Sequence, residues 1–288
     1  MEATPFVSVI IPTYHDWDRL KLCLNALAQQ SYPIDRFEVL VVNNDPDDRP
    51  SYVVASGNVR LLEEAKPGSY AARNAAIRVA KGEVFAFTDS DCIPCDHWIA
   101  LAVTEFKKNN FVDILVGGVE FFYVNKNKPN SAELFSTAFE MAQERYAKNR
   151  RFATANVFIR KSVFDNLGGF NSSLYSGGDF ELAKKADDAG YIFKFLSSVN
   201  VLHPARSKYS QLIQKARRKT SRVRLEAQQS HVIYVKQILK ILYQSLKLFI
   251  EISTKRKPVK HKIMMVPALL VYQSAKIFAL LLPKETDR

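Results

Sequence analysis

The sequence predicts an α/β protein built on an open, Rossmann-like and mostly parallel β-sheet with helices on both faces. Five runs of β-prone apolar residues occur in the first 122 residues, and they are continuous rather than alternating, as expected of strands buried on both faces. Segments with helical spacing of apolar residues lie between them. A length of 288 residues is enough for one large domain of this class and an appendage.

The expected elements follow one another in the order strand, helix, strand, helix. The strands are predicted at residues 6–11, 37–42, 59–62, 84–88 and 114–122. One helix is predicted from Leu20, Cys23, Leu24 and Leu27, and a second from Ala72, Ala75, Ala76 and Val79, with Gly82 as its stop. Ligands of such sheets bind beyond the carboxyl ends of the strands, so functional residues are expected there.

The net charge of +12 is concentrated in one part of the chain. From Ser207 to Lys262 there are 15 Lys and Arg residues against Glu226 and Glu251, a balance of +13, so the rest of the chain sums to −1. The first 206 residues are therefore expected to form a nearly neutral globular domain, and residues 207–288 a basic extension. Nucleic-acid binding is disfavoured because the basic cluster at 215–224 has no interleaved aromatic residues for base stacking.

The three cysteines favour a reducing, intracellular compartment. Cys23, Cys92 and Cys95 are an odd number, and no apolar signal segment stands at the N-terminus of the sequence. Cys92 and Cys95 have the spacing of a redox or zinc pair, but no second pair completes a four-ligand site. We favour the interpretation that they are two small, semi-buried residues.

Two carboxylates directly follow the fourth predicted strand. Val84–Thr88 runs into Asp89, Ser90 and Asp91, and a divalent cation would relieve the repulsion between the two acids while binding phosphate oxygens. A polar turn without a metal is an equally good interpretation of this short motif. The glycine-rich phosphate-binding strings GxGxxG and GxxxxGK[ST] do not occur in the sequence, so a bound diphosphate would need a metal ion and side-chain cations.

A series of motifs in order resembles the family 2 glycosyltransferases of the GT-A fold. The resemblance covers residues 6–220 approximately, with a nucleotide-sugar half at 1–120 and an acceptor half at 121–206. The nucleotide half carries VSVIIPTY at 7–14, EVLVVNN at 38–44, ARN at 72–74, and GEV at 82–84 leading to DSD at 89–91. The acceptor half carries ANVFIRK at 155–161, GGF at 168–170, GGDFEL at 177–182 and HPAR at 203–206.

The resemblance implies a set of donor-side roles. The family often has Asp at positions 43 and 44, where this chain has Asn. Base and ribose contacts are implied for Pro12, Thr13, Tyr14 and Asn44, diphosphate contact for Arg73, donor contacts for Asp89 and Ser90, and metal binding for Asp91 and His203. The implied ion is Mn²⁺ or Mg²⁺, and the donor is expected to be a nucleotide-sugar, with UDP-sugar first.

The resemblance also implies inverting transfer with Asp179 as the general base. Acceptor contacts are implied for Asn156, Gly178 and Glu181. Many family members have Glu at position 178, which is Gly here, and from the residues alone Gly177–Asp179 also fits a helix N-cap. The QxxRW string of processive synthases is incomplete because position 218 is Arg and no Trp follows. One sugar per encounter is therefore expected.

The C-terminal region predicts a helical extension that associates with membranes. Residues 231–252 form an amphipathic pattern in which a broad apolar face, containing Ile238, Leu239, Leu242, Leu246 and Phe249, is edged by lysines. Residues 263–282 are apolar enough to span a bilayer, but two spans would carry the basic loop at 255–262 across the membrane. We favour peripheral or monotopic attachment at the cytoplasmic face; packing of these helices on the core or on a partner subunit is the alternative.

The expected function is transfer of one sugar to a lipid-linked or polysaccharide-precursor acceptor at an anionic membrane surface. A catalytically idle nucleotide-binding scaffold recruited to membranes is the alternative from another class. The sequence leaves the donor sugar, the linkage and a homo-oligomeric state open.

Overall fold

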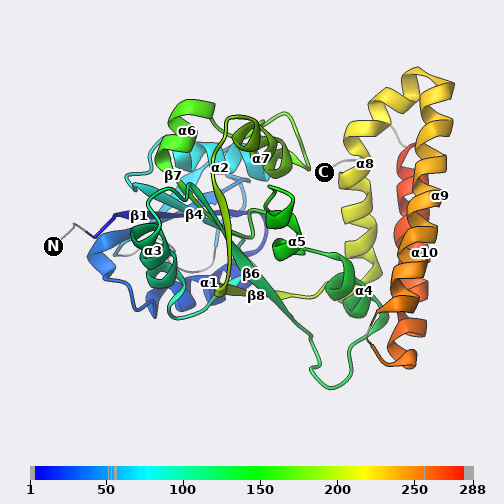
Figure 1. The fold of residues 1–288 in the computed structure, drawn as a ribbon, viewed down its shortest axis with the longest axis horizontal. Coiled ribbons are helices and arrows are strands. Elements are labelled where there is room, and N and C mark those ends of the chain that lie inside the picture. The colour runs from blue at the N-terminus through cyan, green and yellow to red at the C-terminus, as the bar shows by residue number, and fades with distance from the viewer. Residues whose placement is uncertain (1–3, 51, 53, 55–56, 256, 282–288) are drawn as a thin grey trace. The chain divides into compact units, whose positions relative to one another are not determined.

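The computed structural model describes residues 4–50, 52, 54, 57–255 and 257–281 (Figure 1). The chain forms two compact units. The first consists of Met1–Glu120 and Met141–His203, and the second of Phe121–Glu140 and Pro204–Arg288. Among the described residues, each unit has two hydrophobic clusters of its own.

A mixed, mostly parallel sheet forms the centre of the first unit. Its strands are β1 Val7–Thr13, β2 Phe37–Asn43, β3 Val59–Glu63, β4 Val84–Thr88, β5 Ile93–Pro94, β6 Ile114–Phe122, β7 Asn156–Arg160 and β8 Phe193–Pro204. They lie in the order β3-β2-β1-β4-β7-β6-β8-β5. Strands β1 to β4 pair in parallel, whereas β7 is antiparallel to both β4 and β6. The predicted fold class is confirmed, and all five predicted strands are present.

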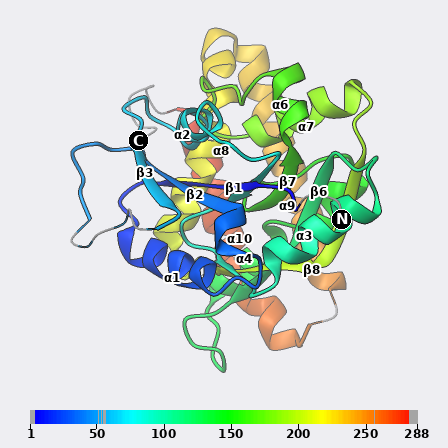
Figure 2. The same ribbon diagram turned by 90° about the vertical axis from the view of Figure 1, so that its left-hand side faces the viewer.

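Helices cover both faces of this sheet (Figures 1 and 2). They are α1 Trp17–Ala28, η1 Ile34–Arg36, α2 Ser69–Ile77, α3 Trp98–Lys108, α5 Gln143–Lys148, α6 Lys161–Leu167 and α7 Gly178–Asp188. Residues of α1 and α3 pack in one cluster, and residues of α2, α6 and α7 pack in the other. The second helix ends at Ile77, so Val79, which was expected on its buried face, lies beyond it and is 40% exposed.

The continuous apolar runs of the strands follow from this two-sided burial. Along β1, Val9 packs with the cluster that contains α1 and α3, while its neighbour Ile10 packs with the cluster that contains α2. Successive side chains of a strand point to opposite faces, and here both faces are covered. Every residue of β1, β2 and β4 is buried. The three strands end in the polar residues Thr13, Asn43 and Thr88, and because the strands are parallel these residues lie at the same edge of the sheet.

The second unit is helical. It contains α4 Ser131–Phe139, α8 Tyr209–Gln229, α9 His231–Thr254 and α10 Val259–Ala279. Asn130 caps α4 in a capping box, because its side chain accepts from the Glu133 amide and the Glu133 carboxylate accepts from the Asn130 amide. Apolar side chains of all four helices, including Phe135, Leu212 and Tyr272, form the main cluster of this unit.

Helix α10 is, among the described residues, the one helix long and apolar enough to cross a membrane by length and composition. One third of its most apolar window, 33%, is buried inside the protein, and Met265, Ala268 and Leu269 belong to the main cluster of the second unit. A core helix of a soluble protein passes the same test. The end of the predicted apolar run, residue 282, lies outside the described residues.

Candidate active site

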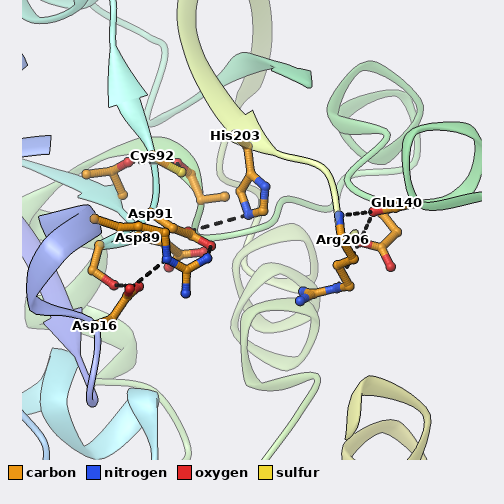
Figure 3. A network of polar contacts seen from close by, with 12 residues as sticks. Asp16, Asp89, Asp91, Cys92, Glu140, His203 and Arg206 are labelled. Carbon is orange, nitrogen blue, oxygen red and sulfur yellow. Dashed lines mark hydrogen bonds and ion pairs between the residues drawn. The ribbon is translucent and has the colours of Figure 1, made fainter. Parts of the chain in front are cut away.

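Acidic and basic side chains gather at the carboxyl ends of the central strands (Figure 3). Strand β4 ends at Thr88, and Asp89, Ser90 and Asp91 follow it directly. Strand β1, its parallel neighbour, ends at Thr13 and leads into a loop that contains Asp16. His203 reaches the same place near the end of β8, which is paired with β5 just after the acidic segment. The predicted edge of the sheet therefore carries the polar cluster.

Asp91 lies between a cation and an imidazole. Its Oδ2 accepts a hydrogen bond from Nη1 of Arg19 at 3.2 Å, and its Oδ1 lies 3.5 Å from Nε2 of His203. The Asp91 side chain is 18% exposed and that of His203 is 3% exposed. Since the two residues are 112 positions apart in the chain, only the return of β8 to this edge brings them together.

Asp91 and His203 have a donor set that fits a divalent cation. One ligand atom each from Asp91, Cys92 and His203 lies within 4.8 Å of the other two. Two ligands at right angles around an octahedral ion lie roughly 3 Å apart, which is close to the Asp91–His203 distance. Mn²⁺ and Mg²⁺ are hard ions that prefer oxygen and nitrogen ligands to sulfur, so Asp91 and His203 rather than Cys92 would hold such an ion.

Asp16 and Arg19 support the acidic segment and were not predicted. Nε of Arg19 donates to Oδ1 of Asp16 at 2.6 Å, and the hydroxyl of Ser90 donates to Oδ2 of Asp16 at 2.9 Å. Burial raises the pKa of Asp16, while Arg19 and Ser90 act against this shift. Asp16 lies in the short loop after β1, and this position near a strand end is the signal that would have identified it, whereas Arg19 lies in the first turn of α1 and had no such signal.

Arg73 extends from α2 to the first carboxylate of the acidic segment. Its Nη2 donates to Oδ1 of Asp89 at 2.6 Å, and its guanidinium carbon lies 5.8 Å from the centre of the Tyr70 ring. Arg73 is 3% exposed, and its buried Nε has no hydrogen-bond partner among the described residues. A buried cation with an unused donor next to a carboxylate is able to bind a further anionic group.

Asp179 stands in the first turn of α7 and has two hydrogen bonds to its Oδ1. The hydroxyl of Tyr70 donates at 3.2 Å, and the backbone N–H of Phe180 donates at 2.9 Å. Burial raises the pKa of the Asp179 carboxyl, although both hydrogen bonds and the charge of Arg73 oppose this. The helix starts here as predicted, but its N-cap is Gly177, with a left-handed φ of 85°, and no side chain caps it.

The predicted base and ribose residues lie at the ends of β1 and β2. Thr13 is buried, and its Oγ1 has no hydrogen-bond partner among the described residues, whereas Tyr14 is 57% exposed. Pro12 is buried within β1. The amide of Asn44 donates to the carbonyls of Glu64 and Lys66, and its oxygen accepts from the Gly68 amide. Asn44 thus holds the loop before α2, and its contact with a base stays a prediction.

The three predicted acceptor residues differ in exposure. Asn156 is fully buried. Its side chain donates to the carbonyls of Gly118 in β6 and Val199 in β8 and accepts from the Trp98 indole in α3, so it links β7 to these three elements. Glu181 is 27% exposed. Gly178 is buried against the Tyr70 ring. Their contact with an acceptor stays a prediction.

Comparisons with known proteins identify the family. Residues 8–168 match the model of "Glycosyl transferase family 2". Glycosyltransferase AglE of Haloferax volcanii is 38% identical over 218 residues, which are 73% of this chain and 70% of AglE. The probable glycosyltransferase YdaM of Bacillus subtilis is 26% identical over 68% of this chain and 50% of its own length.

Solved structures agree with the fold. The mannosyltransferase PcManGT of Pyrobaculum calidifontis, solved with GDP-Man and Mn²⁺, has a TM-score of 0.59 at 19% identity, with 100% of this chain and 89% of that chain covered. TarS residues 1–349 of S. aureus have a TM-score of 0.56 at 21% identity, with coverage of 92% and 70%. The chain belongs to glycosyl transferase family 2 and is a glycosyltransferase with the GT-A fold.

Proposed function

We propose that the protein transfers a single sugar, with inversion, from a UDP-sugar to a hydroxyl of a lipid-linked or polysaccharide-precursor acceptor. The observation that carries this proposal is a continuous path of contacts. Asp179 is hydrogen-bonded to Tyr70, the Tyr70 ring lies beside Arg73, and Arg73 is bonded to Asp89 at the end of β4. The path joins a half-buried carboxylate suited to remove a proton with a buried cation suited to bind a diphosphate.

The donor side of the site is proposed to hold the diphosphate through Arg73 and a divalent ion at Asp91 and His203. Bound there, Mn²⁺ or Mg²⁺ would neutralise charge on the leaving nucleoside diphosphate. Asp89 and Ser90 are proposed to contact the donor, and Thr13 offers a buried hydroxyl without a hydrogen-bond partner among the described residues. PcManGT was solved with GDP-Man and Mn²⁺ and TarS with UDP, which supports a nucleotide donor of this kind.

On the acceptor side, Asp179 is proposed to take the proton of the attacking hydroxyl as the new bond forms. A general base works best when its pKa lies near the working pH, and burial moves the pKa of Asp179 upward from its ordinary value. We assign catalysis to residues 1–206 and membrane attachment to residues 207–288. Transfer of one sugar per encounter is proposed because the Trp of the QxxRW string is missing.

The experiment that tests the function combines calorimetry and transfer assays. With Mn²⁺ present, UDP-sugars and GDP-mannose are titrated into the wild type and into two variants. Asp91→Asn should lose the cation-dependent part of donor binding. Asp179→Asn should bind donor normally and lose transfer by about 100-fold or more. Normal transfer by Asp179→Asn would overturn the assignment of the base, and a donor affinity that Mn²⁺ does not change would overturn the metal site.

Attachment to the cytoplasmic membrane face is proposed through α9. The helix covers His231–Thr254, and along it the apolar side chains of Leu239, Leu242, Leu246 and Phe249 are 51–60% exposed. Ile238, expected on the same face, instead packs beside Ile241. Lys236, Lys240 and Lys247 are exposed on the same helix. Apolar side chains next to lysines match the acyl and headgroup layers of an anionic bilayer.

Vesicle flotation tests the membrane proposal. The wild type should float with vesicles that contain phosphatidylglycerol and bind phosphatidylcholine vesicles less. The double variant Leu239→Glu/Leu246→Glu should lose about tenfold or more in affinity, because each buried leucine contributes roughly 1.5–3 kcal/mol. Leu22→Glu, on α1 and 52% exposed, is the matched control and should float as the wild type does. Equal flotation of the double variant would contradict the proposal.

A further inference from the structure

Tyr70 occupies a position between the two charged groups of the proposed catalytic apparatus. It lies on α2, is 6% exposed, and stacks on Phe170 with ring centres 5.6 Å apart. Its hydroxyl points to Asp179, with a donor–acceptor distance of 3.2 Å, and its ring faces the guanidinium of Arg73. Packing on two sides therefore fixes the ring, and the fixed ring aims the hydroxyl at the carboxylate.

Gly178 makes room for this ring. A Cβ atom at position 178 would lie 2.8 Å from Cε2, 2.9 Å from Cδ2 and 3.0 Å from Cζ of Tyr70. The glycine is not needed for an unusual backbone, because the residue with left-handed φ is its neighbour Gly177. Since any side chain at 178 would meet the aromatic ring, the absence of a side chain and the presence of Tyr70 belong together.

The Tyr70 hydroxyl is a permanent donor. Burial, together with the negative charge of Asp179, raises the pKa of Tyr70 to about 12. The phenol therefore keeps its proton throughout the physiological range. A hydrogen bond to the ionised form of a carboxyl lowers its pKa, and it also holds the side chain in one rotamer. The hydrogen bond from Tyr70 therefore lowers the pKa of Asp179, whereas burial raises it.

Other groups around Asp179 do not replace this contact. Arg73, on the same helix as Tyr70, acts on the carboxylate through its charge. Arg151 faces α7 and donates to the Phe180 carbonyl at 3.3 Å. Glu181, on α7 itself, accepts from Asn171 at 3.2 Å. Among the described residues, Tyr70 is the side chain with a hydrogen bond to Asp179.

We propose that Tyr70 is a positioning residue that orients the Asp179 carboxylate for proton removal, and that Gly178 is required because the Tyr70 ring fills the space of its side chain. The inference rests on the proposed role of Asp179 as the base. It explains in physical terms why this chain departs from the glutamate that many family members have at position 178.

Tyr70→Phe tests the positioning role, because it keeps the ring and its packing and removes only the hydroxyl. Turnover should fall by about tenfold or more, as expected for the loss of a hydrogen bond to a charged group. The acidic limb of the rate profile should move to higher pH, because the ionised form of Asp179 loses a donor. Donor affinity with Mn²⁺ should stay at the wild-type value. Wild-type turnover with an unmoved acidic limb would overturn the proposal.

Tyr52→Phe is the matched control, since it removes a hydroxyl that donates to the Trp17 carbonyl at 2.6 Å and has no contact with Asp179. Its pH profile should equal that of the wild type. The test of Tyr70 as a positioning residue can be distinguished from the test of Asp179 as the base. If Asp179→Asn retains transfer, the base is misassigned. If Asp179→Asn loses transfer while Tyr70→Phe behaves as wild type, only the positioning role fails.

Gly178→Ala tests the steric part. With Tyr70 present the new methyl group should displace the ring and lower turnover. In a Tyr70→Ala background the same change should cost much less, because the ring is gone, so the two substitutions should be strongly non-additive. Equal costs of Gly178→Ala in both backgrounds would contradict the coupling. Thermal melting of all four proteins identifies any variant that fails to fold.

Discussion

Two acidic side chains, the half-buried Asp179 in the first unit and the buried Glu140 in the second, differ in the groups that contact them. Asp179 in the first unit receives hydrogen bonds from the Tyr70 hydroxyl and a backbone amide, and no cation contacts it among the described residues. Glu140 in the second unit is contacted by two cations, Arg206 at 3.2 Å (Figure 3) and Lys215 at 2.9 Å. Glu140 is buried and Asp179 is half-buried, and their immediate partners are of different kinds.

The pKa values of the two acids move in opposite directions. Burial raises the pKa of Asp179 by more than the hydrogen bonds from the Phe180 amide and the Tyr70 hydroxyl lower it. Burial also acts on Glu140, but Lys215 and Arg206 more than offset it, and its pKa is lowered. Burial in turn lowers the pKa of Lys215, while Glu140 opposes that change. An acid with neutral partners remains available for proton transfer, whereas an acid paired with cations serves the stability of the fold.

The largest effect is expected from removing the paired acid. Glu140→Gln leaves the buried Lys215 and the partly exposed Arg206 without their counter-charge, so the free energy of unfolding should fall by about 3–5 kcal/mol. Urea unfolding at pH 7 measures this change. A loss below about 1 kcal/mol would mean that the pair does not stabilise the second unit, and the contrast with Asp179 would disappear.

A change of opposite sign is expected from removing the acid with neutral partners. The folded pKa of Asp179 is raised above its unfolded value, so the native state binds more protons between the two values. The stability of the wild type should therefore fall, relative to Asp179→Asn, as the pH rises through that window. Unfolding in urea from pH 4 to pH 8 measures the difference. A variant that loses stability relative to the wild type as the pH rises would break the comparison.

The smallest effect is expected at an exposed pair. Glu144 and Lys148 on α5 form an ion pair of 2.8 Å, four residues apart, with side chains 62% and 72% exposed. Glu144→Gln should lower the free energy of unfolding by only about 0.5 kcal/mol or less, because water screens the pair. The same urea series measures it. If Glu144→Gln cost as much free energy of unfolding as Glu140→Gln, burial would not explain the difference between the ion pairs of Glu144 and Glu140.

The fold and the location of the site were predictable because their signals are local. The strand Val84–Thr88 and the acids that follow it form one short segment, so its buried end and its carboxylates are visible together. The start of α7 near Gly177 was also predictable from its glycines and the apolar spacing after them. By contrast, the burial of Asn156 and the use of Asn44 to hold a loop had no local signal.

The sequence by itself determined the α/β order, the acidic edge of the sheet and the separation of charge between the first 206 residues and the rest. Only the tertiary structure decided which side chains meet there. Arg19 and Asp91 are 72 residues apart, and Tyr70 and Asp179 are 109 residues apart. Periodicity and turn chemistry act over a few residues, whereas such contacts depend on how the strands pair and on how closely side chains pack between them.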